Sequence, residues 1–210
     1  MTGGNDPYQI KTVEELRDHY DEAMDIVVRA KLKALDDYAI GFIAKAPIVC
    51  IGSEMAEGVD VSPRGGGPGF VHVIDRSHVA VPDWPGNNKL ETMTNILSTG
   101  RCGLLFLVPG NDLFLRINGD AIITRDPDLL ARMTERDKTP KAAIRIAIKE
   151  CYFHCGKAIK RSKIWDAATW PDPKGQPSVG RMMVDQAKIT DMTAEEIQEA
   201  YEESLRNNLY

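Results

Sequence analysis

The sequence predicts a mainly β fold with flanking helices, in which the strands form an antiparallel barrel. Two observations support this fold class. Between residues 47 and 155, short apolar runs alternate with turns rich in Gly, Pro, Asn and Asp, which predicts six or seven strands joined largely as hairpins. Few helical patterns fall between these strands, which argues against the alternating strand and helix order of a parallel sheet.

Helical patterns lie at the two ends of the chain. Residues 1–46 are predicted to be an N-terminal helical extension packed on the barrel, with a capping box that begins at Thr12. Residues 47–165 form the barrel itself. Residues 166–210 are expected to add a loop and a last helix to the same domain, and a second capping box at Thr193 starts that helix.

The strands of the barrel follow from local patterns. Three hairpins are expected: 47–53 with 59–63 across a short acidic turn, 70–75 with 78–83, and 101–108 with 113–125. A further strand spans 142–155. Gly119 predicts a bulge or bend. The apolar phase changes by one residue between Ile148 and Cys151, which predicts a bulge in the last strand or a passage of that strand from one packing environment to another. Asp126 is expected to start a short helix.

Bulk composition limits the classes of partner. The formal net charge of −5 argues against a general affinity for nucleic acid or for acidic membranes. No apolar run approaches the length that spans a bilayer. The first residues lack a basic region followed by an apolar one, so no signal peptide is expected and the protein is predicted to be cytoplasmic.

The four cysteines do not indicate a disulfide framework or a metal site. Cys50 and Cys102 lie in apolar runs, and Cys151 and Cys155 lie in a segment that alternates like a strand. A zinc site would need further ligands nearby, so no metal is expected and the cysteines are predicted to be buried thiols. No nucleophile elbow, zinc-protease motif or P-loop is present, so no catalytic side chain is assigned.

A Pro-Gly turn before a helical pattern is the first candidate site. Asn87 is predicted to be the N-cap, which puts Asn88 and Lys89 in the first turn, while Leu90 and Leu97 lie on the apolar face. A lysine there opposes the helix dipole unless an anion occupies the turn. This pattern therefore predicts a phosphate site. The alternative is an exposed lysine with a small energetic penalty.

Three other segments could contact an anion. A strand ends at Ser62 and Arg64, and four glycines follow within residues 65–69, so the main chain there could approach a ligand closely. Arg116 faces away from the leucines of its strand. Four cations gather within residues 157–163, close to an indole at Trp165. For each segment the alternative is an ordinary solvated surface.

The order and types of these residues resemble the FMN-binding split-barrel superfamily, which includes pyridoxamine 5′-phosphate oxidase. The resemblance runs from about Pro47 to Trp165 and rests on "VDVSPRGGGPGFVHVID", "VAVPDWPGNNKLETMTNIL", "CGLLFLVPG", "LRINGDA" and "FHCGKAIKRSKIW". It implies an antiparallel split β-barrel that binds FMN between the subunits of a homodimer. The residues 87–89 match the Ser-Arg-Lys phosphate motif of the oxidase, with Asn88 in place of its arginine.

The resemblance also implies roles for individual residues. Lys89, Asn88 and Arg64 would contact the phosphate. Ser62 and the main chain at Pro82 and Asp83 would contact the flavin or the ribityl chain. Cations of residues 157–163 would close the site from the partner chain. The predicted cofactor-binding residues are Ser62, Arg64, Pro82, Asp83, Asn87, Asn88, Lys89, Arg116, Lys157, Arg161 and Ser162.

The expected function is that of an FMN-dependent oxidoreductase acting on a small-molecule substrate or electron donor. The flavin would carry the redox chemistry, so no protein acid or base needs to be visible. The segments "SPRG", "PGNN" and "FHCGKAIKRSKIW" resemble an FMN-dependent subgroup of this superfamily more than the oxidase itself. The C-terminal Arg-x-His substrate motif of the oxidase has no counterpart here, which indicates a different substrate. A second hypothesis is a non-catalytic flavin or tetrapyrrole binder on the same barrel. RNA binding through residues 157–163 is a weaker third hypothesis, because the chain is acidic.

Overall fold

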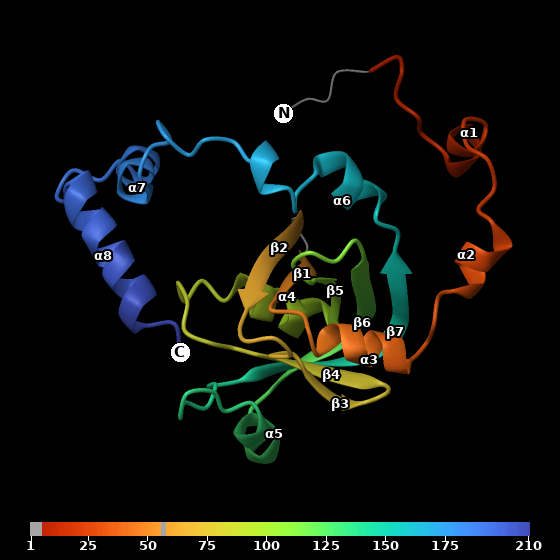
Figure 1. Cartoon of the computed structure of the whole chain (residues 1–210), viewed down its shortest axis with the longest axis horizontal. Coiled ribbons are helices and arrows are strands. Elements are labelled where there is room, and N and C mark those ends of the chain that lie inside the picture. Colours follow the sequence, from red (N-terminus) through yellow and green to blue (C-terminus); the bar gives the residue numbers. More distant parts are fainter. Residues whose placement is uncertain (1–5, 56–57) are drawn as a thin grey trace.

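The computed structural model describes residues 6–55 and 58–210, and its centre is a single antiparallel sheet of seven strands. The strand order is β2-β1-β5-β6-β7-β4-β3, and the sheet curls around a common core without closing (Figure 1). The strands are β1 (Ile48–Met55), β2 (Gly58–Gly65), β3 (His72–Asp75), β4 (His78–Pro82), β5 (Arg101–Leu107), β6 (Phe114–Thr124) and β7 (Ala143–His154). The predicted fold class, a split barrel with flanking helices, is confirmed.

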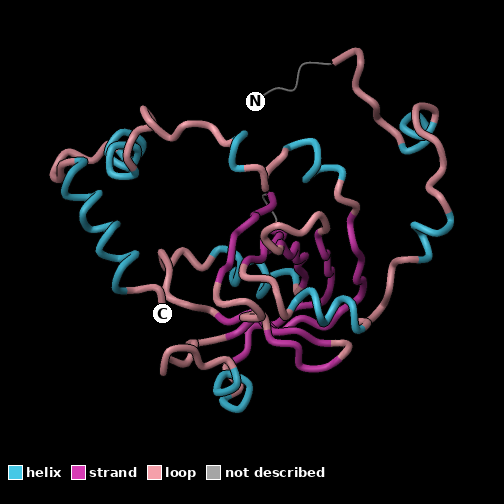
Figure 2. Tube along the Cα trace, viewed as in Figure 1, coloured by secondary structure: helices cyan, strands magenta, loops and turns pink. Residues whose placement is uncertain are grey.

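The three predicted hairpins are all present. β1 pairs with β2, β3 with β4, and β5 with β6, each antiparallel. The acidic turn expected between the first two strands includes residues 56 and 57, which lie outside the described residues, as do residues 1–5. Figure 2 shows the strands gathered at the centre and the helices around them.

The predicted bulge lies where β6 meets β7. Gly119 pairs with Ile148 and Asn118 pairs with Glu150, so Lys149 is the extra residue. This extra residue moves the buried side of β7 from Ile148 to Cys151. Gly119 is required by close contact, since a Cβ there would lie 2.2 Å from the main-chain oxygen of Ala147. The bulge therefore sets both the register and the side-chain phase of the longest strand.

The N-terminal region forms three short helices, α1 (Val13–Arg17), α2 (Asp25–Arg29) and α3 (Asp37–Ile43). α3 buries Ala39, Phe42 and Ile43 in the core. α1 and α2 bury no residue, and in Figure 1 they lie to one side of the barrel. Thr12 caps α1 as predicted, because its hydroxyl accepts from the Glu15 main-chain N–H at 3.1 Å.

The remaining helices are α4 (Glu91–Thr99), α5 (Pro127–Arg132), α6 (Lys157–Ser162), α7 (Val179–Ala187) and α8 (Ala194–Asn207). Asp126 caps α5, and the predicted capping box at Thr193 starts α8. α7 was not predicted from the sequence. It packs on α8 so closely that a Cβ on Gly180 would lie 2.0 Å from the Ala194 main-chain oxygen. α7 and α8 thus form a helical hairpin beside the barrel.

The cysteines differ in burial, which corrects part of the prediction. Cys102 and Cys151 are buried in the core, but Cys50 is only partly buried and Cys155 is exposed. Cys155 directly follows the last residue of β7. Among residues 6–55 and 58–210, no group of His, Cys, Asp or Glu side chains is arranged to hold a metal ion. None of the helices described is both long and apolar enough to cross a membrane.

Candidate functional site

Seven of the predicted cofactor residues line one cavity of about 450 Å³, between β2, the loop that follows β4, and the start of α4. These residues are Ser62, Arg64, Pro82, Asp83, Asn87, Asn88 and Lys89. They come from two segments of the chain, residues 62–64 of β2 and residues 82–89. β4 reaches this cavity through Pro82, and the Asp83 main-chain N–H donates to the Ala142 oxygen at 2.9 Å, which fixes the strand end.

The loop before α4 differs from the prediction. α4 begins at Glu91, and its N-cap position is Leu90, which has a left-handed conformation with φ 58°. Asn87 is therefore not the N-cap. Its side chain instead accepts from the Lys89 main-chain N–H at 3.1 Å, which closes a local turn. Lys89 therefore lies in the loop ahead of the helix, and the dipole argument does not apply to it.

The buried face of α4 also differs from the prediction. Thr92, Asn95 and Ile96 are buried, whereas Leu90 and Leu97 are exposed. Asn95 donates to the Ser53 hydroxyl at 3.0 Å, which ties α4 to β1 through a buried polar pair. Because two of the three buried side chains are polar, the apolar period of the sequence indicated the wrong face.

Arg64 is held in place by a chain of hydrogen bonds. Its Nη1 donates to the Ser62 hydroxyl at 2.7 Å and to the Pro63 oxygen at 2.9 Å, and its Nη2 donates to the Thr92 hydroxyl at 3.4 Å. Thr92 in turn donates to Asp60 at 3.0 Å. These bonds use three of the five guanidinium hydrogens, so Nε and one Nη2 hydrogen stay available for an oxyanion.

The charges that line the cavity are balanced. Arg64 and Lys89 are cations, and Asp83 and Glu91 are carboxylates. Lys89 lies 3.4 Å from Glu91 in an exposed ion pair, so its charge is partly neutralised and screened. The half-buried Arg64 is therefore the stronger anion-binding group of the cavity.

Asp83 is an unusual carboxyl for such a site. Burial raises its pKa above the usual range, and the nearby cations Arg64 and Lys141 only partly oppose this effect. The native state thus binds the proton of Asp83 more tightly than the unfolded chain does. The contribution of Asp83 to stability is consequently greatest at low pH and decreases as the pH rises from about 4 through the raised pKa.

We expect Asp83→Asn to stabilise the protein at pH 7, because it removes a charge that is partly shielded from water. The increase should be below about 1 kcal/mol, since the group is half exposed, or about 1–3 °C in Tm. Thermal unfolding of both proteins between pH 3 and pH 8 measures this. The difference in Tm should disappear below about pH 4. A difference that grows as the pH falls would contradict the assignment.

Four predicted residues lie away from this cavity. Arg116 alternates with the buried Leu115 and Ile117, so it lies on the opposite face of β6, where it pairs with Glu150. Glu150 also pairs with Lys31 at 3.2 Å. The other three, Lys157, Arg161 and Ser162, belong to α6, and none of them lines the cavity.

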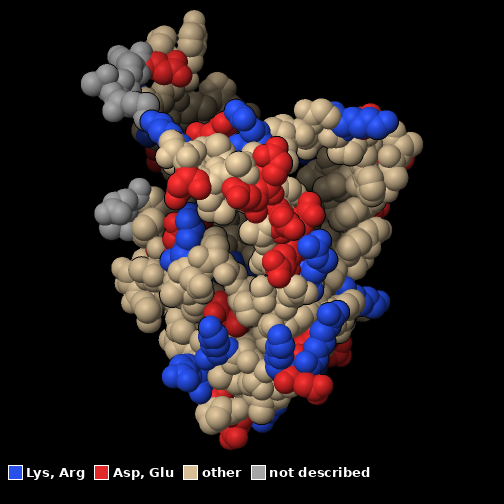
Figure 3. Space-filling model, turned by 90° about the vertical axis from the view of Figure 1, so that its left-hand side faces the viewer, with Lys and Arg blue, Asp and Glu red and all other residues tan. Residues whose placement is uncertain are grey.

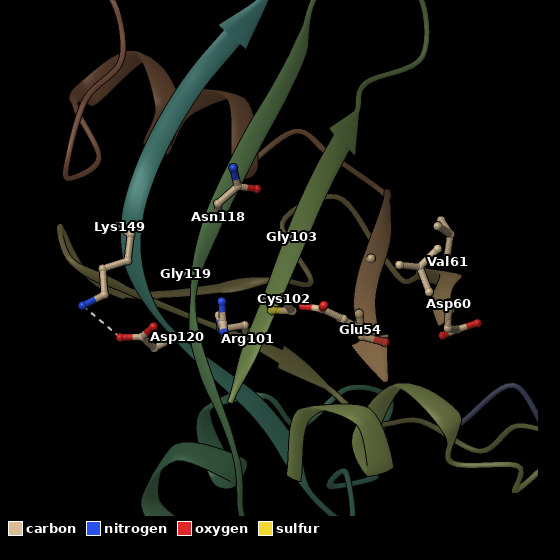
Figure 4. A pocket seen from close by; sticks show the side chains of 13 residues that line it. Glu54, Asp60, Val61, Arg101, Cys102, Gly103, Asn118, Gly119, Asp120 and Lys149 are labelled. Carbon is tan, nitrogen blue, oxygen red and sulfur yellow. Dashed lines mark ion pairs between the residues drawn. The ribbon is translucent and has the colours of Figure 1, made fainter. Parts of the chain in front are cut away.

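A second cavity, of about 550 Å³, lies against the sheet and contains none of the predicted residues. Gly52, Gly103 and Gly119 line it, together with Val59 and Val61 of β2 (Figure 4). At one side Lys149 pairs with Asp120 at 2.9 Å. We take the smaller cavity as the candidate site, because it brings together seven of the predicted cofactor residues and because Arg64 is oriented there with N–H groups free for an oxyanion.

Sequence reasoning did not identify several residues of the candidate site. Thr92 and Asp60 orient Arg64, and Trp84 and Leu209 line the cavity. Thr92 gave no signal, because it lies off the predicted helix face. Leu209 follows the last helix and reaches the cavity only through the tertiary fold.

Residues 35–155, more than half of the chain, match the sequence profile of the family described as pyridoxamine 5′-phosphate oxidase. No curated protein matches the chain. Among solved structures, HupZ of Group A Streptococcus is 16% identical, with a TM-score of 0.48, over 57% of this chain and 93% of that one.

Two further solved structures are similar to this chain. A Clostridium acetobutylicum protein related to general stress protein 26, of the pyridoxinephosphate oxidase family, is 11% identical, with a TM-score of 0.40, over 56% of this chain and 86% of that one. An FMN-binding protein of Syntrophomonas wolfei is 12% identical, with a TM-score of 0.40, over 54% and 78%.

Proposed function

The chain belongs to the pyridoxamine 5′-phosphate oxidase family, and from this premise we propose that it binds FMN and acts as an FMN-dependent oxidoreductase. The observation that carries the proposal is the Arg64 side chain, which lines a cavity large enough for part of a nucleotide and retains free hydrogen-bond donors. Ser62, Asn87, Asn88 and Lys89 add further donors around it. Bound FMN would supply the redox chemistry, while the protein binds and orients it.

Arg64 and the amides of the loop before α4 would hold the phosphate. A guanidinium with two free N–H groups suits an oxyanion, because both can donate to one phosphate. Ser62 and the main chain at Pro82 and Asp83 would contact the ribityl chain or the flavin ring. The residues that line this cavity belong to one chain and would contact the phosphate and ribityl side of the ligand. The remaining contacts to the flavin would come from elsewhere.

We propose that a second copy of the chain completes the site in a homodimer. Val59 and Val61 are 81% and 69% exposed beside the larger cavity, and exposed apolar side chains of this kind favour an interface. Arg116, Lys157, Arg161 and Ser162, which lie outside the cavity, would then reach the cofactor of the partner. Sedimentation of the FMN-loaded protein tests this, and a stable FMN-bound monomer would refute it.

The proposed function is tested by comparing FMN with riboflavin, which differs only by the phosphate. FMN should bind at least about tenfold more tightly, because charged hydrogen bonds contribute about 1.5–3 kcal/mol. Isothermal titration of the ligand-free protein gives both dissociation constants. Equal constants would exclude a phosphate site in this cavity.

Enzymatic activity is distinguished from simple carriage by turnover. Reduction of the bound flavin by a nicotinamide cofactor, followed by reoxidation with an acceptor over many cycles, would establish an oxidoreductase. A protein that binds FMN but does not turn over would be a flavin carrier or sensor, which is the second candidate.

We expect no efficient oxidation of pyridoxamine 5′-phosphate. The substrate has its own phosphate, and the C-terminal Arg-x-His substrate motif of the oxidase has no counterpart in this sequence. In its place α8 carries five glutamates and a single arginine, and acidic side chains gather on the face that carries α7 and α8 (Figure 3). Such a face repels a phosphate. The assay supplies pyridoxamine 5′-phosphate and oxygen to the flavin-loaded protein and follows aldehyde and peroxide. Turnover in the common range of about 1–1000 per second would contradict this expectation.

A further inference from the structure

The segment that follows α8 returns to the barrel and reaches the candidate site. Leu209 lines the 450 Å³ cavity together with Trp84 of the loop before α4. The neighbouring Tyr210 packs its ring edge-on against Trp84, with ring centroids 5.1 Å apart and an interplanar angle of 74°. Figure 1 shows the C-terminus beside the barrel, below the α7–α8 hairpin.

Tyr210 is held by a tight turn at residues 135–138. Its hydroxyl donates to Glu135 at 3.0 Å, the Arg136 guanidinium lies 5.0 Å from its ring centroid, and Lys138 donates to its main-chain oxygen at 2.6 Å. Burial and the Glu135 carboxylate both raise the pKa of Tyr210, so the hydroxyl stays protonated and can donate. Three different interactions therefore hold Tyr210, two through its side chain and one through its main chain.

The turn that contacts Tyr210 is closed by main-chain hydrogen bonds of its own. Glu135 and Lys138 exchange two main-chain hydrogen bonds of 2.9 Å, and Arg136 and Asp137 both have left-handed φ values, 50° and 61°. These values match a type I′ turn, in which two non-glycine residues adopt a strained conformation. Glu135 also packs on the glycine loop, because a Cβ on Gly67 would lie 3.2 Å from its carboxylate.

Trp84 depends on this packing for its position. Its Nε1 is buried and has no hydrogen-bond partner among the residues that the structure describes. The indole is therefore not oriented by a hydrogen bond of its own, and among the described residues its aromatic contact is the edge-on packing with Tyr210. A wall of the cavity thus depends on a side chain more than 100 residues away in the sequence.

We infer that Tyr210 is a positioning residue of the candidate site: it holds Trp84 and Leu209 as one wall of the cavity, so that residues 208–210 form a latch over the bound ligand. The role at FMN rests on the proposed function, whereas the docking of the latch does not. With the latch in place, the ligand leaves slowly. With the latch undocked, the loop at 83–90 is mobile and the ligand leaves faster.

The test compares Tyr210→Ala with Tyr210→Phe, which keeps the ring but loses the bond to Glu135, and with Tyr201→Ala as the matched control. Tyr201 lies on α8, is 40% exposed and is not part of the latch. Hydrogen exchange of the ligand-free proteins measures protection at residues 83–90. Stopped-flow release measures the rate at which FMN leaves.

We expect Tyr210→Ala to lose protection at residues 83–90 and to release FMN about tenfold faster or more, given the aromatic contact and the hydrogen bond that are lost. Tyr210→Phe should fall between this variant and the natural chain, and Tyr201→Ala should match the natural chain. Unchanged exchange in Tyr210→Ala overturns the latch, and changed exchange with unchanged FMN release overturns its role at the ligand. If the natural chain binds no FMN, the proposed function fails, and the exchange measurement alone decides whether the latch docks.

Discussion

We expect Arg64→Ala to bind FMN about tenfold to 150-fold more weakly than the natural chain, a loss of about 1.5–3 kcal/mol. The guanidinium is half-buried and already oriented by Ser62 and Thr92, so it pays little entropy to bind the phosphate. Isothermal titration with FMN measures the loss. The same substitution should change riboflavin binding much less, because riboflavin has no phosphate.

Two variants make this result specific. Arg29→Ala removes an exposed arginine of α2 that lines neither cavity and should leave FMN binding unchanged. Lys89→Ala should cost less than Arg64→Ala, about 1 kcal/mol or below, because Lys89 is exposed and paired with Glu91. A larger loss from Lys89→Ala than from Arg64→Ala would mean that the phosphate lies in the loop before α4 and not at β2.

The largest expected effect on stability comes from Gly119→Ala. The new methyl group would lie 2.2 Å from the Ala147 main-chain oxygen and 2.8 Å from the Ile146 side chain. Both residues belong to β7, which is buried and paired on both sides, so neither atom can move away without a loss of stability. Overpacking of this kind costs about 1–3 kcal/mol or more. Differential scanning calorimetry should show a Tm lower by about 4–10 °C, or a protein that does not fold.

Gly41→Ala is the matched control for this substitution. Gly41 lies inside α3, and a Cβ there meets no atom within 4 Å. Alanine should stabilise the helix by about 0.5–1 kcal/mol, since glycine is a poor helix former. If Gly119→Ala proves as mild as Gly41→Ala, the close approach of β6 and β7 at the bulge is not present in solution.

The alternation of apolar and polar residues along the chain predicted almost all strands of the sheet. Buried and less buried side chains alternate strictly around Val49, Leu104 and Leu115, because the two faces of each strand lie in different environments. The turn residues between the strands then determine which strands form hairpins. The bulge at Lys149 could be predicted because a one-residue phase change moves every later side chain to the other face. Local chemistry was sufficient in these cases.

The sequence did not predict the features that depend on tertiary contacts, such as the buried face of α4. α4 presents Thr92 and Asn95 to the core, since each finds a polar partner on the sheet, and no period in the sequence reveals that partner. α4 starts at Glu91 and not after Asn87 as predicted, because the Asn87 side chain accepts from the Lys89 main-chain N–H within the loop. α7 was missed because it directly follows a Pro-rich stretch, which the sequence indicates as a loop.

The candidate site was predicted only where the family resemblance supplied the correspondence. Ser62, Arg64 and the loop at 82–89 do line one cavity. Local patterns alone left each of these segments open between a ligand site and a solvated surface. The tail at Leu209 could not be predicted, because its contact with Trp84 joins segments that share no sequence signal.

The uneven burial of the cysteines has a consequence if the chain binds FMN as proposed. Reduced flavins react with oxygen and release peroxide, which oxidises thiolates faster than protonated thiols. Burial raises the pKa of Cys102 to about 12 and of Cys151 to about 11, so these two thiols stay protonated and resist oxidation. Cys155 is exposed beside the start of α6. If the chain turns over FMN as proposed, oxidative damage would therefore accumulate at the more accessible thiols, Cys155 above all, and leave the core intact.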